Sequence, residues 1–277
     1  MSILLKDLDE LIINFLELPA LVNLMQTNKY YNTIISKKDL IKEWNFIKNI
    51  TRMNSIFIET CNLGFIAYAK SLIARYKIDI HMLSECALTT SCYNGHYEIV
   101  KWLIDLGENH GYGKINIHID SEYAFRLSCN HGHHEIAKWL IDLAKNHGYE
   151  KINIHTEYEH AFRWGCLYYE IAKWLINLGE NHGYGRINIH EISECAFRKN
   201  CANGNHEIAK WLIDLGENHG YGRIDIHSAS EDAFKSSCIN GHYEIAKWLI
   251  DLGENHGYGK IDINIMNVYI KKLNNIT

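Results

Sequence analysis

One pattern of apolar and polar residues recurs along this chain. In the stretch EIVKWLIDLGENHGYG, which begins at Glu98, apolar residues follow one another at intervals of three and four, and this spacing predicts a helix. The apolar positions are Ile99, Val100, Trp102, Leu103, Ile104 and Leu106. They form a wide stripe, so the helix is expected to be covered on more than one side. Close copies of the stretch begin at Glu135, Glu170, Glu207 and Glu244.

The tryptophans of these copies give the period of the repeat. They are separated by 37, 35, 37 and 37 residues, a period typical of stacked supersecondary units rather than of one globular core. Neighbouring repeats in such an array cover each other's apolar faces. The row consists of Trp102, Trp139, Trp174, Trp211 and Trp248. Because these residues stand at helical spacing on an apolar face, we interpret them as core and not as a ligand cage.

Each regular repeat is predicted to contain two helices. The first begins at a serine followed by glutamate, as at Ser121; the hydroxyl is expected to accept an orphan amide, and the acid to favour the helix dipole. Pairs such as Asn94-Gly95 then allow a tight turn into the second helix. Gly107 is expected to end that helix in the C′ position, before a polar NHGYG loop and a short extended segment at residues 115–117.

The pattern also gives the domain organisation. A helical module is predicted at residues 1–50, a degenerate first repeat at 53–83 and a C-terminal tail at 267–277. The degenerate repeat lacks the NHGYG loop and has Ser71 where later repeats have tryptophan, and such departures are common in end repeats. The five regular repeats are residues 84–120, 121–157, 158–192, 193–229 and 230–266.

Two regular repeats depart from the pattern. In the third, Leu167-Tyr168-Tyr169 replaces the Asn-Gly turn and two residues are missing, so its first helix is expected to end early or its turn to be remade. In the second, Ala144 and Lys145 replace Gly-Glu. Its second helix is expected to run longer, because alanine is about 1 kcal/mol better than glycine inside a helix.

The order of helix, Asn-Gly turn, helix, loop and extended segment resembles the ankyrin repeat. The GHxEIVKxLL core of that family appears as GHYEIVKWLI at residues 95–104 and as GHYEIAKWLI at 241–250, and the resemblance covers residues 53–266. The family's TPLH opening is replaced by YAFR at 123–126, and the NHGYG loop lengthens the usual period. The resemblance implies an all-α ankyrin-repeat solenoid that binds proteins on its concave side.

The N-terminal residues do not share the repeat. Apolar residues at helical spacing predict short helices, with a break at Pro19. The string that closes at Trp44 resembles the F-box, a helical module that docks onto the adaptor of cullin-based ubiquitin ligases. Its acid-Leu-Ile opening at residues 10–13 carries the resemblance, although the usual Leu-Pro near the start is absent. The alternative is a cap that covers the apolar face of the first repeat.

The F-box resemblance implies a set of exposed apolar residues for the adaptor, whereas a cap would turn them all toward residues 53–83. The expected adaptor-docking residues are Leu11, Ile12, Phe15, Leu18, Leu21 and Leu24. The near-identical tryptophan-bearing copies, the Asn/Ile/Lys/Tyr-rich composition and the F-box-like segment together resemble the ankyrin-repeat proteins of mimivirus-type giant viruses. That resemblance implies a viral protein in the host-cell cytoplasm.

Charge and composition narrow the function classes. The formal net charge is −5 and the basic residues are scattered, which argues against a nucleic-acid partner. No apolar run approaches the roughly 20 residues that span a bilayer, and the start MSILLKDLDE has acids where a signal peptide carries basic residues. We therefore expect a soluble, cytoplasmic protein, monomeric and without a membrane partner.

The cysteines fit a reducing compartment. Six of them occupy one place in successive repeats, and packed helices are too far apart for disulfides between them, so we expect small buried thiols. These are Cys61, Cys92, Cys129, Cys166, Cys201 and Cys238. Cys86 and Cys195 lie outside that register.

The seventeen histidines suggest a metal site, but most of them form two ladders, one in the NHGYG loops and one at the extended segments. Members of a ladder stand one repeat apart and do not converge on one ion, so we interpret them as polar loop packing. No phosphate-binding or hydrolase motif is present, and the acids recur at what we take to be surface positions of each repeat. We expect no metal, no cofactor and no catalytic residue, and therefore a binding protein rather than an enzyme.

The positions that differ between copies indicate where a partner would bind. The Ala-Phe, Cys and EIAKWLI positions hardly change, whereas positions around the first helix do. In ankyrin proteins, by resemblance, this side faces the partner, although drift at exposed positions is an equal alternative. The predicted partner-binding residues are Tyr123, Leu127, His160, Trp164, Lys199 and Asp232, with Trp164 as the anchor. Two functions stay open: a substrate receptor of a ubiquitin ligase, and a scaffold or decoy whose N terminus only caps the stack.

Overall fold

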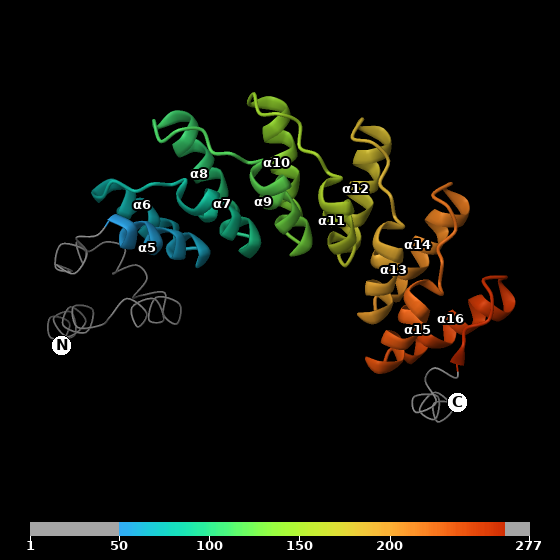
Figure 1. Ribbon diagram of the computed structural model, residues 1–277. Helices are drawn as coiled ribbons and strands as arrows, with labels where there is room; N and C mark the ends of the chain where they lie inside the picture. Colours follow the sequence, from blue (N-terminus) through green and yellow to red (C-terminus); the bar gives the residue numbers. More distant parts are fainter. Residues whose placement is uncertain (1–49, 264–277) are drawn as a thin grey trace, which may run out of the picture. The chain divides into compact units, whose positions relative to one another are not determined.

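The computed structural model describes residues 50–263, and in that range the secondary structure is helical, without β-strands (Figure 1). The helices are α5 (Ile50–Asn62), α6 (Ile66–Arg75), α7 (Met82–Asn94), α8 (Tyr97–Asn109), α9 (Ile119–Asn130), α10 (His134–Asn146), α11 (Thr156–Gly165), α12 (Tyr169–Asn181), α13 (Glu191–Ala202), α14 (His206–Asn218), α15 (Ser228–Ile239) and α16 (Tyr243–Asn255). The chain forms two compact units, Met1–Asn116 and Ile117–Thr277. The first contains α5 to α8, and the second contains α9 to α16.

The helices follow the predicted repeat, so the expected all-α array of helix-turn-helix repeats is confirmed. In the second compact unit the first helices of the repeats lie side by side, α9 against α11, α11 against α13 and α13 against α15, and each packs on the second helix of its own repeat. The predicted N-terminal module, with its six adaptor-docking residues, and the predicted C-terminal tail lie outside the described residues.

The core is built from the positions that hardly change between copies. The phenylalanines of the first helices, Phe125, Phe162, Phe197 and Phe234, are fully buried. So are the leucines that follow the tryptophans, Leu103, Leu140, Leu175, Leu212 and Leu249. Each such side chain contributes about 1.5–3 kcal/mol relative to exposure, and the predicted wide apolar face of the second helix is thereby confirmed.

The six cysteines in register are buried free thiols, as predicted. Burial raises the pKa of Cys166 to about 12 and that of Cys238 to about 11. A thiol with so high a pKa carries almost no thiolate near neutral pH, and the thiolate is the reactive form. These cysteines therefore serve as small core side chains.

The tryptophans are not fully buried, and their assignment to the core needs correction. All five are partly exposed, and Trp102, Trp174, Trp211 and Trp248 each contact an aromatic residue of the preceding repeat. The ring centroids of Trp174 and Phe125 are 6.2 Å apart, and those of Trp211 and Tyr169 are 5.4 Å apart. These tryptophans therefore pack against the neighbouring repeat while part of each side chain stays exposed.

The first helix does not begin at a serine N-cap, and that prediction was wrong. Ser121 has a left-handed φ of 56°, as do its neighbours Asp120 (47°) and Glu122 (64°), and no side chain caps the helix by a hydrogen bond. The same three-residue left-handed turn occurs in the other regular repeats. Each left-handed residue other than glycine costs about 1–2 kcal/mol, so neighbouring groups must hold the turn in place.

An arginine side chain stabilises the left-handed turn by hydrogen bonds to its backbone. Arg126 donates from Nε to the carbonyl oxygen of Ser121 and from Nη2 to that of Asp120, both at 2.7 Å. Arg163 and Arg198 make the same pair of bonds in their repeats. The arginine of the AFR string that these three repeats share thus provides hydrogen-bond donors for the backbone carbonyls of the left-handed turn.

A histidine–glutamate pair also stabilises the left-handed turn. Glu122 is buried, its carboxylate lies 2.9 Å from Nδ1 of His118 in the preceding repeat, and its Oε1 accepts the backbone N–H of Asn153, near the end of its own repeat, at 3.0 Å. The same i,i+4 pair recurs as His81–Glu85, His155–Glu159, His190–Glu194 and His227–Glu231. These glutamates were expected at the surface, near a helix dipole; instead each one ties two parts of the array together.

The second helix ends later than predicted. Gly107 lies inside α8, which continues to Asn109, and the left-handed residue that follows is Gly111. Gly107 is needed for a different reason, because a Cβ there would lie 2.5 Å from the carbonyl oxygen of Gly113 in the loop. In the second regular repeat, α10 ends at Asn146, level with the other copies, so the expected lengthening by Ala144 was wrong.

The third regular repeat has the irregular junction that its sequence predicts. Its first helix, α11, has 10 residues and ends at Gly165, before the buried Cys166, whereas the first helices on either side have 12 residues. The remade turn places the ring of Tyr168 over Gly132 of the preceding repeat, where a Cβ would lie 2.6 Å from the ring. In the adjoining repeats, a histidine ring fills the equivalent place above Gly204.

Candidate functional site

Five of the six predicted partner-binding residues lie on the first helices of the second compact unit, with their side chains at least partly exposed. Tyr123 comes from α9, His160 and Trp164 from α11, Lys199 from α13 and Asp232 from α15. We call these five residues the helix-one surface. Leu127, the sixth, is only 7% exposed; it points into the stack between helices and therefore does not belong to this surface.

The centre of the helix-one surface is a stacked pair. Lys199 Nζ lies 2.8 Å from the centre of the Trp164 ring, and the centroid of the His160 ring, four residues earlier on α11, lies 6.1 Å from that of Trp164. Burial lowers the pKa of Lys199. Burial and the nearby Arg126 and Arg163 lower the pKa of His160 to about 4, so its imidazole is neutral at physiological pH.

A second pair lies next to the first. Arg198 Nη1 donates to Asp232 Oδ2 at 2.5 Å, and Ser236 Oγ donates to the other carboxylate oxygen at 3.1 Å. Asp232 is therefore fixed in orientation across two repeats. Arg198 was not predicted as a site residue, because the sequence gives no sign that the arginine of the recurring AFR string also reaches a side chain of the next repeat.

The left-handed turns add exposed apolar residues beside this surface. Tyr158 is 69% exposed and Ile192 is 48% exposed, and both lie in the left-handed turns that precede the first helices. Neither residue was predicted to be at the site. A signal was present for Tyr158, since the other regular repeats have serine at its position, whereas the position of Ile192 has leucine, aspartate, glutamate or alanine in the other copies. Because the sequence predicts a helix N-terminus at these positions, such differences between copies would be interpreted as ordinary variation.

The arrangement is suited to recognition. It combines an indole face, one lysine, one arginine–aspartate pair and exposed tyrosine and isoleucine side chains, and such aromatic and arginine side chains are enriched where binding energy concentrates. Within residues 53–263 no group of three or more His, Cys, Asp or Glu side chains is placed to hold a metal ion. No helix in that part of the chain is long and apolar enough to cross a membrane.

The fold defines a class: a stack of two-helix repeats whose first helices present a continuous surface. Residues 56–155 match the family model for ankyrin repeats, in three copies. This part of the chain therefore consists of ankyrin repeats, and the helix pairs from α11 to α16 continue the same arrangement. No curated protein matches the chain. Ankyrin repeats are protein-interaction modules, so an interaction function follows from the class of fold.

Proposed function

We propose that this chain is an adaptor that binds a protein partner on the helix-one surface of its second compact unit. The observation that carries the proposal is the Trp164–Lys199 stack, which sits among residues that differ from copy to copy and is bordered by the exposed Tyr158 and Ile192. The scaffold around it hardly changes, and the variable residues of this surface are at least partly exposed, although other variable positions such as Leu127 and Asn200 are buried.

The geometry supports a peptide or protein partner rather than a small molecule. The helix-one surface extends over four successive first helices, α9, α11, α13 and α15, and two of its contacts, Lys199–Trp164 and Arg198–Asp232, join neighbouring repeats. A partner that places an acidic side chain on Lys199 and an apolar one on Trp164 would use both groups of the stack. No enzymatic activity is proposed, because the surface has no nucleophile held by a base.

The experiment is capture of partners by the immobilised full chain from extract of the cell in which it acts. Trp164→Ala and Asp232→Arg should each reduce the amount of a specific partner at least tenfold, whereas Lys260→Glu, a charge change at an exposed lysine of the last repeat, should not. A partner that all three variants capture equally well would locate binding elsewhere.

We further propose that residues 5–44 act as an F-box-like docking module, which would make the chain a substrate receptor of a cullin-based ubiquitin ligase. The support is the sequence resemblance alone, since the residues concerned lie outside the described range. A pull-down with the purified F-box-binding adaptor tests it. Leu18→Asp with Leu21→Asp should abolish adaptor capture and leave the repeats folded; loss of the helical signal from the whole array would instead favour the cap.

The alternative is a non-enzymatic scaffold or decoy, in which the N-terminal helices only cover the first repeat. Under both functions we propose a monomer in the cytoplasm of a host cell, with a host protein as partner and without a nucleic-acid or membrane partner, in line with the resemblance to the giant-virus proteins. Sedimentation of the purified chain and its distribution after expression in a host cell would test these points.

A further inference from the structure

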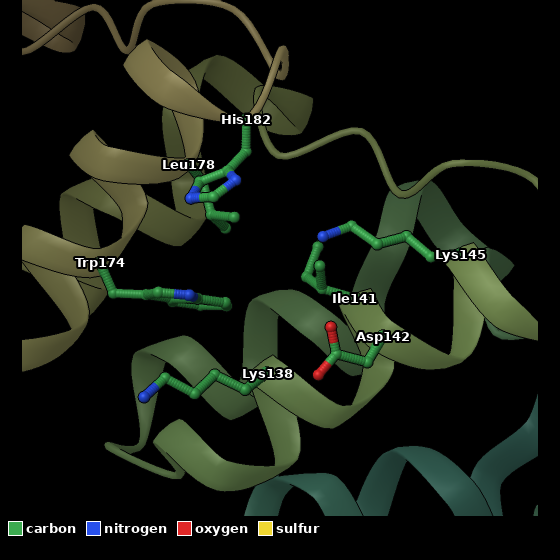
Figure 2. Close-up of a pocket in the computed structure, with 7 residues that line it drawn as sticks. All are labelled: Lys138, Ile141, Asp142, Lys145, Trp174, Leu178 and His182. Atoms are coloured by element: carbon green, nitrogen blue, oxygen red, sulfur yellow. The ribbon is translucent and has the colours of Figure 1, made fainter.

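A groove opens in the second compact unit between the second helices α10 and α12 (Figure 2). The indole of Trp174 and the side chain of Ile141 form its apolar wall, and Lys138, Asp142, Lys145 and His182 form its polar rim. These residues come from helices other than those of the helix-one surface, so the groove is a separate site.

The groove differs from the same place in the next two repeats because a glutamate has been replaced by lysine. Tyr221 Oη donates to Glu180 at 2.8 Å, and Tyr258 Oη donates to Glu217 at 2.6 Å. The corresponding residues here are Lys145, which lines the groove, and Tyr184, whose buried hydroxyl does not line it. A lysine ammonium has no acceptor for a tyrosine hydroxyl.

The Tyr184 hydroxyl consequently lacks the acceptor that its counterparts have. Tyr184 is 8% exposed, and its hydroxyl has no hydrogen-bond partner among the described residues. Burial, reinforced by Asp142, raises the pKa of this hydroxyl, so it stays a donor at physiological pH. Lys145 Nζ lies 5.9 Å from the Tyr184 ring centre. A donor and a cation therefore stand where the next two repeats have a donor and a carboxylate.

The loop histidine of the groove also lacks its usual partner. In three other repeats this histidine pairs with an aspartate of its own second helix. The pairs are His110–Asp105 at 3.2 Å, His219–Asp214 at 3.3 Å and His256–Asp251 at 3.4 Å. Asn177 occupies the aspartate position next to His182, so a second acid is missing from the same groove. Both replacements make this junction more positive than its counterparts.

We propose that the groove binds the carboxylates of an acidic segment of a protein partner. One carboxylate would pair with Lys145 and supply the negative charge that the Glu180 carboxylate provides at the next junction, with the apolar stem of its side chain on Trp174. Lys138 lies seven residues from Lys145 on α10, which is about 10 Å along a helix. In a polyproline II segment, acids three residues apart share one face at about 9 Å, so the two lysines can pair with two such acids.

The test is an NMR titration of the full chain with the peptide acetyl-Gly-Glu-Pro-Leu-Glu-Gly-amide. Saturable shifts are expected for the Trp174 indole and the amides of α10 and α12, with a Kd of about 0.1–1 mM. The peptide with glutamine in place of both glutamates should not bind. Binding of the glutamine peptide with equal affinity, saturable shifts confined to other helices, or no shift at all at about 5 mM peptide would overturn the proposal.

Lys145→Glu provides the matched variant, because it restores the acid found in the next two repeats. It should weaken peptide binding at least tenfold and leave the thermal midpoint unchanged or higher, while Lys260→Glu should leave binding unchanged. Asn177→Asp restores the aspartate that pairs with the loop histidine in other repeats. It should weaken peptide binding severalfold, because it makes the groove less positive without changing Lys145. Wild-type affinity in both Lys145→Glu and Asn177→Asp would refute the assignment of the groove.

Discussion

The imidazole of His190 lies 2.8 Å from the carboxylate of Glu194 through Nδ1, and its Nε2 lies 2.9 Å from the carbonyl oxygen of Tyr221. Both neighbours are acceptors, whereas a neutral imidazole has only one N–H. Both bonds are therefore complete only when the ring is protonated. Burial by itself lowers the pKa of His190, but the two hydrogen bonds outweigh it, and the pKa is raised. His81 and His227 have the same neighbours and raised pKa values.

The stability of the repeats should therefore fall as the pH rises from about 6.5 through the raised pKa values of these histidines. A histidine whose pKa is higher in the folded chain contributes stability that is complete below the unfolded value of about 6.5 and is lost as the pH passes the raised value. His160 acts in the opposite direction: its folded pKa of about 4 means that its contribution is lost as the pH falls below about 6.5. Urea unfolding between pH 5 and pH 9, followed by circular dichroism, measures the loss of stability on both the alkaline and the acidic side.

Glu194→Gln isolates one histidine–glutamate pair. It should destabilise the array by about 1–3 kcal/mol at pH 6, because a buried partner is lost, and it should reduce the decline above neutrality. Glu207→Gln, which removes an exposed charge 3.7 Å from Lys210, is the control and should cost less than about 1 kcal/mol. An unchanged pH profile in Glu194→Gln would show that the pair does not carry the pH dependence.

Gly216→Ala should destabilise its repeat although alanine favours helices. Gly216 lies inside α14, where a Cβ would meet the carbonyl oxygen of Gly222 in the loop. Overpacking of this kind costs about 1–3 kcal/mol, more than the helix gain of about 1 kcal/mol. Ala144→Gly, at the equivalent place in a repeat whose loop ends in Glu150 instead of glycine, should cost about 1 kcal/mol through helix propensity alone. Thermal unfolding of the two variants separates these effects; stabilisation by Gly216→Ala would contradict the close approach.

Trp164 and Trp174 should respond differently to replacement by alanine. Trp174 contacts Phe125 and His134 of the preceding repeat, and its loss should cost about 2–3 kcal/mol, near the lower end for aromatic truncation because the ring is partly exposed. Trp164→Ala removes the Lys199 stack and should cost about 1 kcal/mol or less. Denaturant midpoints for the two variants test this; equal costs would make Trp164 a structural residue.

The third regular repeat should exchange its amides faster than the fourth. Its first helix is two residues shorter than the neighbouring ones, and its turn has no glycine in the left-handed position. Fewer helical hydrogen bonds lower the free energy of local opening. Hydrogen exchange on residues 158–192 and 193–229 measures the difference, and equal protection of the two would contradict the prediction.

The features that depend on periodicity could be predicted from the sequence. The spacing of Ile99, Leu103 and Leu106 puts them on one face of a helix, whatever that helix packs against. The two residues missing before Glu170 require a shorter connection between the helices of that repeat. Neither argument needs contacts between repeats. The buried cysteine row and the order of the helices follow for the same reason.

The features that depend on contacts between repeats could not be predicted in this way. Ser121 and Glu122 match a helix N-terminus in every local respect, yet the turn is left-handed because Arg126 and the His118–Glu122 pair hold it from outside the turn. The i,i+4 spacing of His118 and Glu122 was visible in the sequence and would have suggested the pair. Leu127 shows the opposite error, since variation between copies was taken as exposure when the residue is buried.

The central claim is that a protein partner binds the helix-one surface, and photo-crosslinking tests it most directly. A photoreactive amino acid is placed at His160, or at Lys260 as a control, in the full chain within the cells where it acts. The account predicts one discrete crosslinked protein from position 160, its loss when Trp164→Ala is added, and no such product from position 260. The same products from both positions, or a product from 160 that survives Trp164→Ala, would contradict it.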